Sequence, residues 1–377
     1  MTARSPANAD RWPGTVVAIQ ANFSSVQLDA SNATAQPDSG SLKLLCVRRG
    51  LLKKLGQQVM VGDRVEVEQP DWQDRRGAIA TILPRKTALD RPPVANVDQI
   101  LLVFALAEPT LDPNQLTRFL VKAESTGIPI QLCLNKQDLI SDQQAKHWQH
   151  RLADWGYRPT FVSLRQDSPQ VDALTAQLQG RISVVAGPSG VGKSSLINRL
   201  IPAQTLRVGA VSGKLGRGRH TTRHVELFEL PQGGFLADTP GFNQPDIQCS
   251  PEALGDCFPE IRQRLADQSC QFSNCLHRDE PGCVVRGDWE RYDYYLTLLD
   301  EVLAQQQTLD EQRNAEATEK VKVSADGKLQ HEPRLAAKKY RRPSRKARNQ
   351  AFQEICYDLS DAEDLSQLED LEDLGLE

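Results

Sequence analysis

The nine residues GPSGVGKSS at positions 187–195 follow the apolar run ISVVA and precede the segment LINRLI. They fit G-x-x-x-x-G-K-[ST], and a strand before and a helix after supply the context in which this pattern forms a phosphate-binding loop. The glycines let backbone N–H groups turn inward around phosphates, and the helix directs its positive end at them. A glycine-rich turn without a ligand is the alternative that this context disfavours. We expect phosphate contacts from Gly187, Pro188, Ser189, Gly190, Val191, Gly192, Lys193, Ser194 and Ser195, with Lys193 reaching the β and γ phosphates and Ser194 binding Mg²⁺.

A second pattern, NKQD at residues 135–138, follows the apolar run IQLCL. Ligand-binding loops of a doubly wound sheet lie at the carboxyl ends of its strands, where this sequence falls. The Asp138 carboxylate can accept hydrogen bonds from the ring N–H and the exocyclic amine of guanine, a donor pair that adenine lacks. The pattern predicts GTP rather than ATP, with contacts from Asn135, Lys136, Gln137 and Asp138. Ser163, at the end of RPTFVSL, is expected to support the base, although the next residue, Leu164, departs from the alanine usual in GTPases.

The segment DTPGF at residues 238–242 supplies a third element, D-x-x-G. We expect Asp238 in the Mg²⁺ shell and the Gly241 N–H at the γ phosphate. Between this segment and the phosphate loop lies GRGRHTTRH, in which Thr221 or Thr222 could complete the metal shell. Both threonines stay candidates for GTP contact, and Ser194, Thr222 and Asp238 form the predicted magnesium set.

The order of these elements is informative, because the base-reading NKQD precedes the phosphate loop, the reverse of ordinary GTPases. A circular permutation explains this order, since domain termini tend to lie close together at the surface. Apolar runs alternate with helical segments, including a helix expected at residues 112–125, which predicts a doubly wound parallel sheet. We place this α/β domain at residues 85–245, of which the first stretch, RKTALDRPPVANVD at 85–98, is expected to be a linker.

Five short β-branched or alternating runs lie between residues 14 and 83, separated by Gly, Asp, Asn and Pro. They predict a small barrel at 11–84, behind a flexible N-terminus at 1–10 and with a mobile polar loop at 31–41. An OB-like barrel is the first interpretation, and a Tudor-like or SH3-like barrel would give the same pattern. Nucleic-acid contact and a role as structural spacer both remain open for it.

Four residues near the C-terminal third form C-x4-C-x-H-x5-C, namely Cys270, Cys275, His277 and Cys283. Three thiolates and one imidazole predict one structural Zn²⁺ with every position filled by protein. Buried free cysteines are the alternative, but the histidine would then have no evident partner in so polar a segment. A helix at 288–307, with a core stripe of Trp289, Tyr292, Leu296, Leu299 and Leu303, completes a mostly helical region at 246–307.

Composition limits the class of protein. The 377 residues are 39% hydrophobic and 25% charged with a net charge of −4, so nothing biases the whole chain towards polyanions. The longest apolar run is too short to span a bilayer and MTARSPANAD lacks the core of a signal peptide, which predicts a cytoplasmic protein without membrane contact. The polar tail at 308–377 holds a basic block at 338–348, either an rRNA contact or a solvated charge run, and an acidic end at 358–377.

Together these motifs resemble the bacterial family of ribosome small subunit-dependent GTPase A. The likeness covers about residues 11–305 and rests on the barrel, the NKQD-before-GPSGVGKSS order, GRHTT, DTPGF and the C-x4-C-x-H-x5-C pattern. It implies a monomeric, zinc-containing GTPase that binds the immature small ribosomal subunit and its rRNA in the GTP state and leaves after hydrolysis to GDP.

The residue after D-x-x-G is Phe242, where many GTPases have a glutamine that orients water. We therefore expect slow hydrolysis until another group positions the water, and the resemblance supports His220 as that group. Lys193 is the second residue that we expect to act in catalysis. A P-loop kinase or ATPase is one rival, which NKQD disfavours. The other is an RNA-binding assembly protein whose GTP site does not hydrolyse.

Overall fold

The computed structural model describes residues 11–29, 42–54, 56–90, 92–165, 169–202, 225–238, 247–316, 319–323 and 329–333. The chain forms two compact units, 1–304 and 305–377, which are described separately. Expectations for His220, Thr221, Thr222, Gly241 and Phe242, for both termini and for the loop at 31–41 fall outside these residues. Among the described residues, no helix combines the length and the apolar composition that crossing a bilayer requires.

Five strands close into a barrel in the order β1-β2-β3-β5-β4. Strand β3 runs parallel to β5, β4 closes against β1, and the short helix α1 (Gly50–Lys54) lies between β3 and β4 in the chain. This order is that of an OB fold and not that of an up-and-down barrel, so the OB-like interpretation is confirmed. The strands are β1 (Trp12–Gln20), β2 (Phe23–Leu28), β3 (Lys43–Arg48), β4 (Arg64–Asp71) and β5 (Arg76–Ile82).

The segment expected to be a linker is folded. It forms the hairpin of β6 (Ala88–Asp90) and β7 (Pro93–Ala95), and the Ala95 N–H donates to the Val61 carbonyl at 2.8 Å. Leu89 and Val94 belong to the same buried core as the central sheet, as does Val17 of β1. Strands of three residues are too short to show an alternating pattern, which explains why the sequence did not reveal them.

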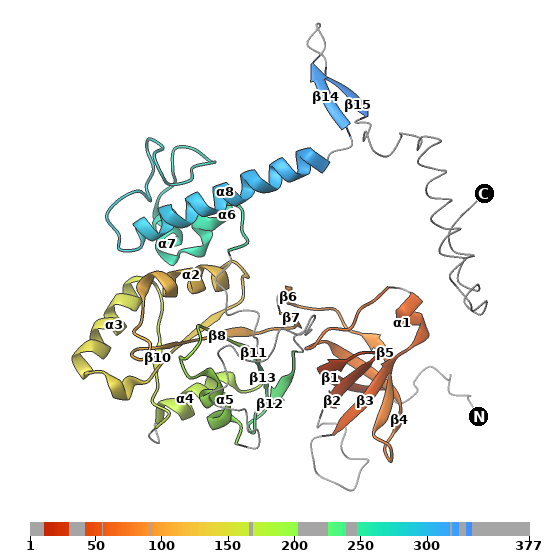
Figure 1. Ribbon diagram of the computed structural model, residues 1–377. Coiled ribbons are helices and arrows are strands. Elements are labelled where there is room, and N and C mark those ends of the chain that lie inside the picture. The colour runs from red at the N-terminus through yellow and green to blue at the C-terminus, as the bar shows by residue number, and fades with distance from the viewer. Residues whose placement is uncertain are drawn as a thin grey trace, which may run out of the picture. The chain divides into compact units, whose positions relative to one another are not determined.

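The central sheet has six strands in the order β10-β9-β8-β11-β13-β12, parallel except for the edge strand β12. Helices α2 (Pro113–Glu124) and α3 (Asp142–Asp154) cover one face, and α4 (Pro169–Leu178) and α5 (Lys193–Leu200) cover the other (Figure 1). The predicted doubly wound, circularly permuted fold is confirmed. The strands are β8 (Gln99–Ala105), β9 (Ile130–Asn135), β10 (Thr160–Phe161), β11 (Ile182–Ala186), β12 (Leu227–Glu229) and β13 (Phe235–Asp238).

The sequence at the start of α2 has the features of a helix N-terminus. The Asp112 carboxylate accepts from the backbone N–H groups of Asn114 and Gln115, and Pro113 occupies the first turn, where a missing N–H costs nothing. Ser125 is the C-cap, so the predicted helix at 112–125 is confirmed with its caps included.

The metal-motif region contains α6 (Pro251–Leu254), α7 (Pro259–Asp267) and α8 (Tyr292–Glu316). The predicted core stripe is confirmed, because Leu299 is buried and Trp289, Tyr292, Leu296 and Leu303 are partly buried against the same core. The fully buried side chains of α8 also include Tyr295, Leu298 and Val302. Of the predicted stripe, only Leu299 is fully buried. Tyr292 stays at the edge because its hydroxyl donates to the His277 carbonyl at 2.9 Å. In the second unit, β14 (Glu319–Val323) pairs antiparallel with β15 (Leu329–Pro333).

An ion pair fixes the turn before β4. Asp63 is fully buried and accepts from the Arg85 guanidinium at 2.6 and 3.0 Å and from the Met60 N–H at 2.7 Å. Replacing Asp63 with alanine leaves these donors without their acceptor, so we expect the free energy of unfolding to fall by about 2–3 kcal/mol. Urea unfolding measures this loss against Asp74→Ala, which changes an exposed carboxylate. Equal midpoints for the two variants would contradict the assignment.

Candidate nucleotide site and metal cluster

The loops that the sequence singled out meet at one edge of the central sheet. NKQD follows β9, the glycine-rich loop follows β11, and Asp238 ends β13 beside Val185 of β11. All three strands are parallel, so their carboxyl ends lie on the same side of the sheet. The side chain of Asp238 and residues 239–246 lie outside the described part, and the expected magnesium set is therefore only partly visible.

The glycine-rich loop has the backbone of an anion-binding loop. Gly187, Gly190 and Gly192 have φ values of 138°, 82° and 96°, a region that side chains disfavour. The Lys193 ammonium donates to the carbonyls of Gly187 and Pro188 at 2.8 and 2.6 Å, and so folds back over its own loop. Helix α5 begins at Lys193 and points its N-terminus at the same space.

Two residues of NKQD bind this loop directly. The Asn135 side-chain amide donates to the Val191 carbonyl at 2.8 Å, and its oxygen accepts from the Lys136 N–H at 2.8 Å. The Lys136 ammonium donates to the Gly190 carbonyl at 3.1 Å and to the Glu108 carbonyl. The NKQD segment and the glycine-rich loop, distant in sequence, are therefore joined by direct hydrogen bonds.

Asp138 is held for hydrogen bonding by its neighbours. The Ser163 hydroxyl donates to one carboxylate oxygen at 2.7 Å, and the Arg165 guanidinium lies 4.0 Å from the other. The Gln137 N–H donates to the Val162 carbonyl at 3.1 Å, which fixes the loop against the segment that follows β10 and contains Ser163. The structure brings Asp138 and Ser163 together through the serine hydroxyl, and the expected support of the base by Ser163 stays a prediction.

A cavity of about 330 Å³ opens beside these groups. Leu164, the departure noted in the sequence, gives it an apolar wall. Glu108 and Arg165 were missed by the sequence reasoning; Glu108 follows β8, and the rule that loops at carboxyl strand ends bind ligands would have included it. The lining residues are Glu108, Asn135, Lys136, Asp138, Leu139, Leu164, Arg165, Gly192 and Ser195.

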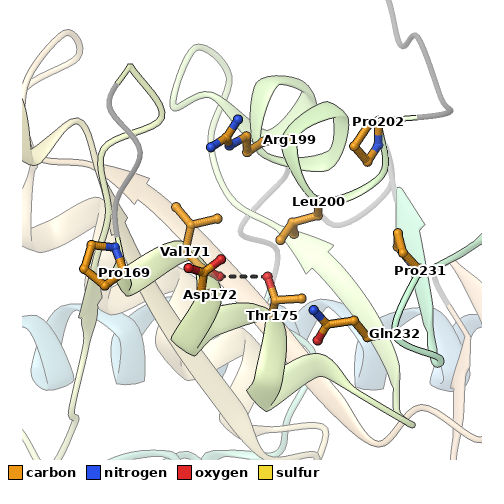
Figure 2. A pocket seen from close by; sticks show the side chains of 9 residues that line it. All are labelled: Pro169, Val171, Asp172, Thr175, Arg199, Leu200, Pro202, Pro231 and Gln232. Carbon is orange, nitrogen blue, oxygen red and sulfur yellow. Dashed lines mark hydrogen bonds between the residues drawn. The ribbon is translucent and has the colours of Figure 1, made fainter.

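A larger hollow of about 500 Å³ lies elsewhere, between α4, the end of α5 and the turn joining β12 to β13 (Figure 2). Prolines and aliphatic groups dominate its lining, and only Asp172 and Arg199 carry charge. It contains no residue of the glycine-rich loop or NKQD, so its size does not make it the nucleotide site. Its lining is Pro169, Val171, Asp172, Thr175, Arg199, Leu200, Pro202, Pro231 and Gln232.

The four residues of C-x4-C-x-H-x5-C converge, with their ligand atoms all within 4.8 Å of one another. The Cys270 sulfur lies 3.9 Å from that of Cys283, and the His277 Nδ1 lies 3.6 Å from Cys270 and 3.5 Å from Cys283. Neighbouring ligand atoms of a tetrahedral zinc are roughly 3.5–3.8 Å apart, given Zn–S of about 2.3 Å and Zn–N of about 2.0 Å. The cluster is therefore compatible with a metal site.

The protein around the cluster supports metal binding. Backbone N–H groups of His277 and Arg286 donate to the sulfurs of Cys275 and Cys283, both at 3.4 Å, which stabilises thiolates. Burial lowers the pKa of His277, which favours the neutral imidazole that binds metal. Of the remaining described cysteines, Cys46, Cys133 and Cys257 are buried and Cys249 partly so, in agreement with packing roles.

Comparison with known families and curated proteins identifies relatives. The model described as RsgA GTPase matches residues 82–248, and the model described as 50S ribosome-binding GTPase matches residues 182–318. The chain is 58% identical to the small ribosomal subunit biogenesis GTPase RsgA of Trichormus variabilis, over 91% of this chain and 96% of that protein. It is 45% identical to a mitochondrial RsgA 1 of Arabidopsis thaliana, over 90% and 85% of the two chains.

Solved structures give the same result. YjeQ from Thermotoga maritima matches with a TM-score of 0.64 and 32% identity, over 78% of this chain and 99% of that one. YloQ, described as a circularly permuted GTPase, matches with a TM-score of 0.64 and 30% identity, over 80% and 99% of the two chains.

Gly192 offers a test of the contact between NKQD and the phosphate loop. A β-carbon at Gly192 would overlap the Asn135 amide, so we expect Gly192→Ala to lower GTP affinity at least about tenfold, a cost of ~1.4 kcal/mol. Isothermal titration calorimetry measures the affinity. The control is Gly127→Ala, which has a similar φ of 68° but open space around the new methyl group. Equal affinities for both variants would refute the role of this contact.

Proposed function

The chain belongs to the RsgA GTPase family, and on this premise we propose that it is a GTP hydrolase acting in the biogenesis of the small ribosomal subunit. The observation that carries the nucleotide choice is the Asp138 carboxylate, held by Ser163 at the mouth of a cavity next to the phosphate loop. Two carboxylate oxygens fit the ring N–H and amine of guanine, whereas adenine offers no such pair.

For the nucleotide, we propose that residues 187–195 bind the phosphates and residues 135–138 the base. Lys193 would exchange its two loop carbonyls for the β and γ phosphates, because a phosphate is a stronger acceptor for an ammonium than a carbonyl is. Mg²⁺ would be held by Ser194, Thr222 and Asp238, where it would neutralise phosphate charge, and Gly241 would donate to the γ phosphate. Thr221 stays the alternative to Thr222.

For the chemical step, we propose that His220 positions the attacking water. Phe242 cannot hydrogen-bond to water, so hydrolysis needs a group from another segment. Binding to the small subunit would place His220 next to this water, and hydrolysis would then release the protein in the GDP state.

The barrel has a surface suited to rRNA. Phe23 and Val47 are directly paired across β2 and β3, and Leu45 lies two residues further along the same face of β3. These three side chains are 45%, 42% and 41% exposed, which is unusual for large apolar groups. The β2–β3 face of an OB fold is the one that binds oligonucleotides, and an exposed aromatic ring can stack on a base. We propose that this face contacts rRNA.

For the Cys270, Cys275, His277 and Cys283 cluster, we propose one structural zinc. The cluster supplies four protein ligands at tetrahedral spacing and leaves no position for a substrate. Its contribution would be to folding, because the loop at residues 268–287 contains no regular helix or strand.

We further propose that the protein is a monomer and acts in the cytoplasm, where its ribosomal subunits would be assembled. One relative is named mitochondrial. The alternative to an active GTPase is an RNA-binding assembly protein whose GTP site only stabilises the fold. It predicts GTP binding without turnover in the presence of small subunits.

Turnover with purified small subunits tests the function. We expect GTP hydrolysis to be slow alone and to rise by orders of magnitude with subunits, by analogy with activated GTPases, in which an activating partner can be worth about 10³–10⁵ in rate. Phosphate release measures turnover, ATP tests base selection, and Lys193→Ala is the blank. Full stimulation of His220→Ala would reject only the role of His220. Absence of stimulation in the native chain would favour the non-hydrolysing alternative.

Metal analysis tests the zinc assignment. We expect one equivalent of zinc in the purified chain, and we expect Cys283→Ser to lose it and to lower the thermal midpoint, because the loop at 268–287 depends on the metal. Cys46→Ser is the control, since Cys46 lies in the barrel, far from the cluster in the fold. A metal-free native chain with an unchanged midpoint after chelation would exclude a structural zinc.

A further inference from the structure

The region from α6 to α8 contains the Cys270, Cys275, His277 and Cys283 cluster and is here called the metal region. It packs against the elements next to the proposed guanine-reading residues. Helix α3 begins three residues after Asp138, with Ser141 as its N-cap, and the chain beyond α3 returns through β10 to Ser163. The turn between α3 and β10, which holds Trp155, Gly156 and Tyr157, lies against the metal region. Asp138 and Ser163, on the two sides of the proposed base site, are therefore each separated from this interface by a short stretch of chain.

Arg291 is the centre of the interface. It is fully buried, and its guanidinium lies 4.7 Å from the Trp155 ring, 5.6 Å from the Tyr157 ring and 5.0 Å from the Phe258 ring. It makes a bidentate ion pair with Glu260, which is itself buried. A buried ion pair clamped among aromatic rings tolerates little displacement, because separating the charges leaves each of them desolvated.

Residues on either side of Arg291 extend the contact. The Glu290 carboxylate accepts from the Trp155 indole N–H at 2.8 Å and from Arg151 of α3 at 2.5 Å. At Gly156, with φ of 89°, a β-carbon would lie 2.7 Å from that of Pro259, so the two chains are in close contact there. The turn cannot move independently of the metal region.

Helix α2 makes a second line of contact. Arg118 forms a bidentate pair with Glu301 at 2.8 and 2.7 Å, and this hydrogen bonding lowers the pKa of Glu301. Glu124 accepts from the Tyr157 hydroxyl and from Arg262 of α7, both at 2.9 Å. Burial raises the pKa of Tyr157, so the hydroxyl remains a donor to Glu124.

The same short segment also holds the metal loop. The Tyr292 hydroxyl donates to the His277 carbonyl at 2.9 Å, and the Tyr295 hydroxyl donates to the Leu276 carbonyl at 2.6 Å. Residues 289–295, here called the connector segment, therefore touch the metal loop on one side and the α3–β10 turn on the other. A displacement at one side is transmitted through a close-packed set of contacts to the other.

We propose that the interface formed by the connector segment, together with the Arg118–Glu301 pair, sets the rate at which guanine nucleotide leaves the site. This regulation rests on the proposed function, since it presupposes a guanine nucleotide between NKQD and the phosphate loop. Loosening the interface frees α3 and β10; Asp138 lies shortly before α3 in the chain, and Ser163 shortly after β10. By linkage, bound nucleotide also stabilises the metal region.

The experiment measures release of a fluorescent N-methylanthraniloyl-GDP from the full chain after addition of excess GDP. Gly156→Ala inserts a methyl group against Pro259, and we expect release to accelerate about fivefold or more, the lower range of coupling between sites. Glu301→Gln weakens only a partly exposed ion pair at the interface and keeps the test valid if Gly156→Ala does not fold. It too should accelerate release.

Two controls match these variants. Asp300→Asn alters the neighbouring residue of α8, whose partner is Arg278 within the metal region at 2.7 Å, and should leave release unchanged. Gly127→Ala reproduces the backbone strain without a close neighbour. A native chain that fails to bind the labelled GDP overturns the proposed function. A native chain that binds it, with folded Gly156→Ala and Glu301→Gln releasing at the native rate, overturns only the proposed role of this interface.

The effect of bound nucleotide on the metal cluster gives the reciprocal test of the coupling. Transfer of zinc to a chromogenic chelator should be slower with saturating GDP in the native chain, and this protection should shrink in Glu301→Gln. Zinc transfer at the same rate with and without GDP would overturn the coupling.

Discussion

The hydrogen bond from the Asn135 amide to the Val191 carbonyl is the constraint on which the nucleotide site depends. In this permuted chain the base-reading half comes first and the phosphate-binding half second, so no short loop holds them in register. Parallel pairing of β8 with β11 brings the halves together, and Asn135 and Lys136 then fix the loops at the strand ends. Permutation is tolerated because the site needs these contacts rather than any particular chain order.

The parts of the fold that were predictable are those with a local physical signature. The glycine-rich loop, the helix capped by Asp112 and the spacing of Cys270, Cys275, His277 and Cys283 are all determined by near neighbours in sequence. The hairpin β6–β7, the burial of Tyr295 and the burial of Arg291 depend on distant partners. An arginine at position 291 reads as a surface residue until Glu260, Trp155 and Phe258 are known to surround it.

The residues of the candidate site also divide into those with a local signature in the sequence and those that depend on distant partners. Asp138 and Ser163 were predicted together because each ends an apolar run at the same sheet edge. Glu108 contacts Lys136 through its backbone carbonyl. Every residue type has this carbonyl, so the identity of residue 108 does not predict the contact. The described contacts of the metal region with the GTPase domain are made by α2 and by the turn after α3.

The barrel and the central sheet share a core to which Val17, Val61, Leu89 and Val94 all contribute. A boundary drawn at residue 84 looks natural in the sequence, yet it cuts through this core. The barrel is therefore not an interchangeable module. A fragment lacking it would present freshly bared apolar surface to its neighbours in solution, and a foreign barrel grafted in its place would need to match the packing of β1. The barrel and the GTPase domain are therefore subject to one shared packing constraint.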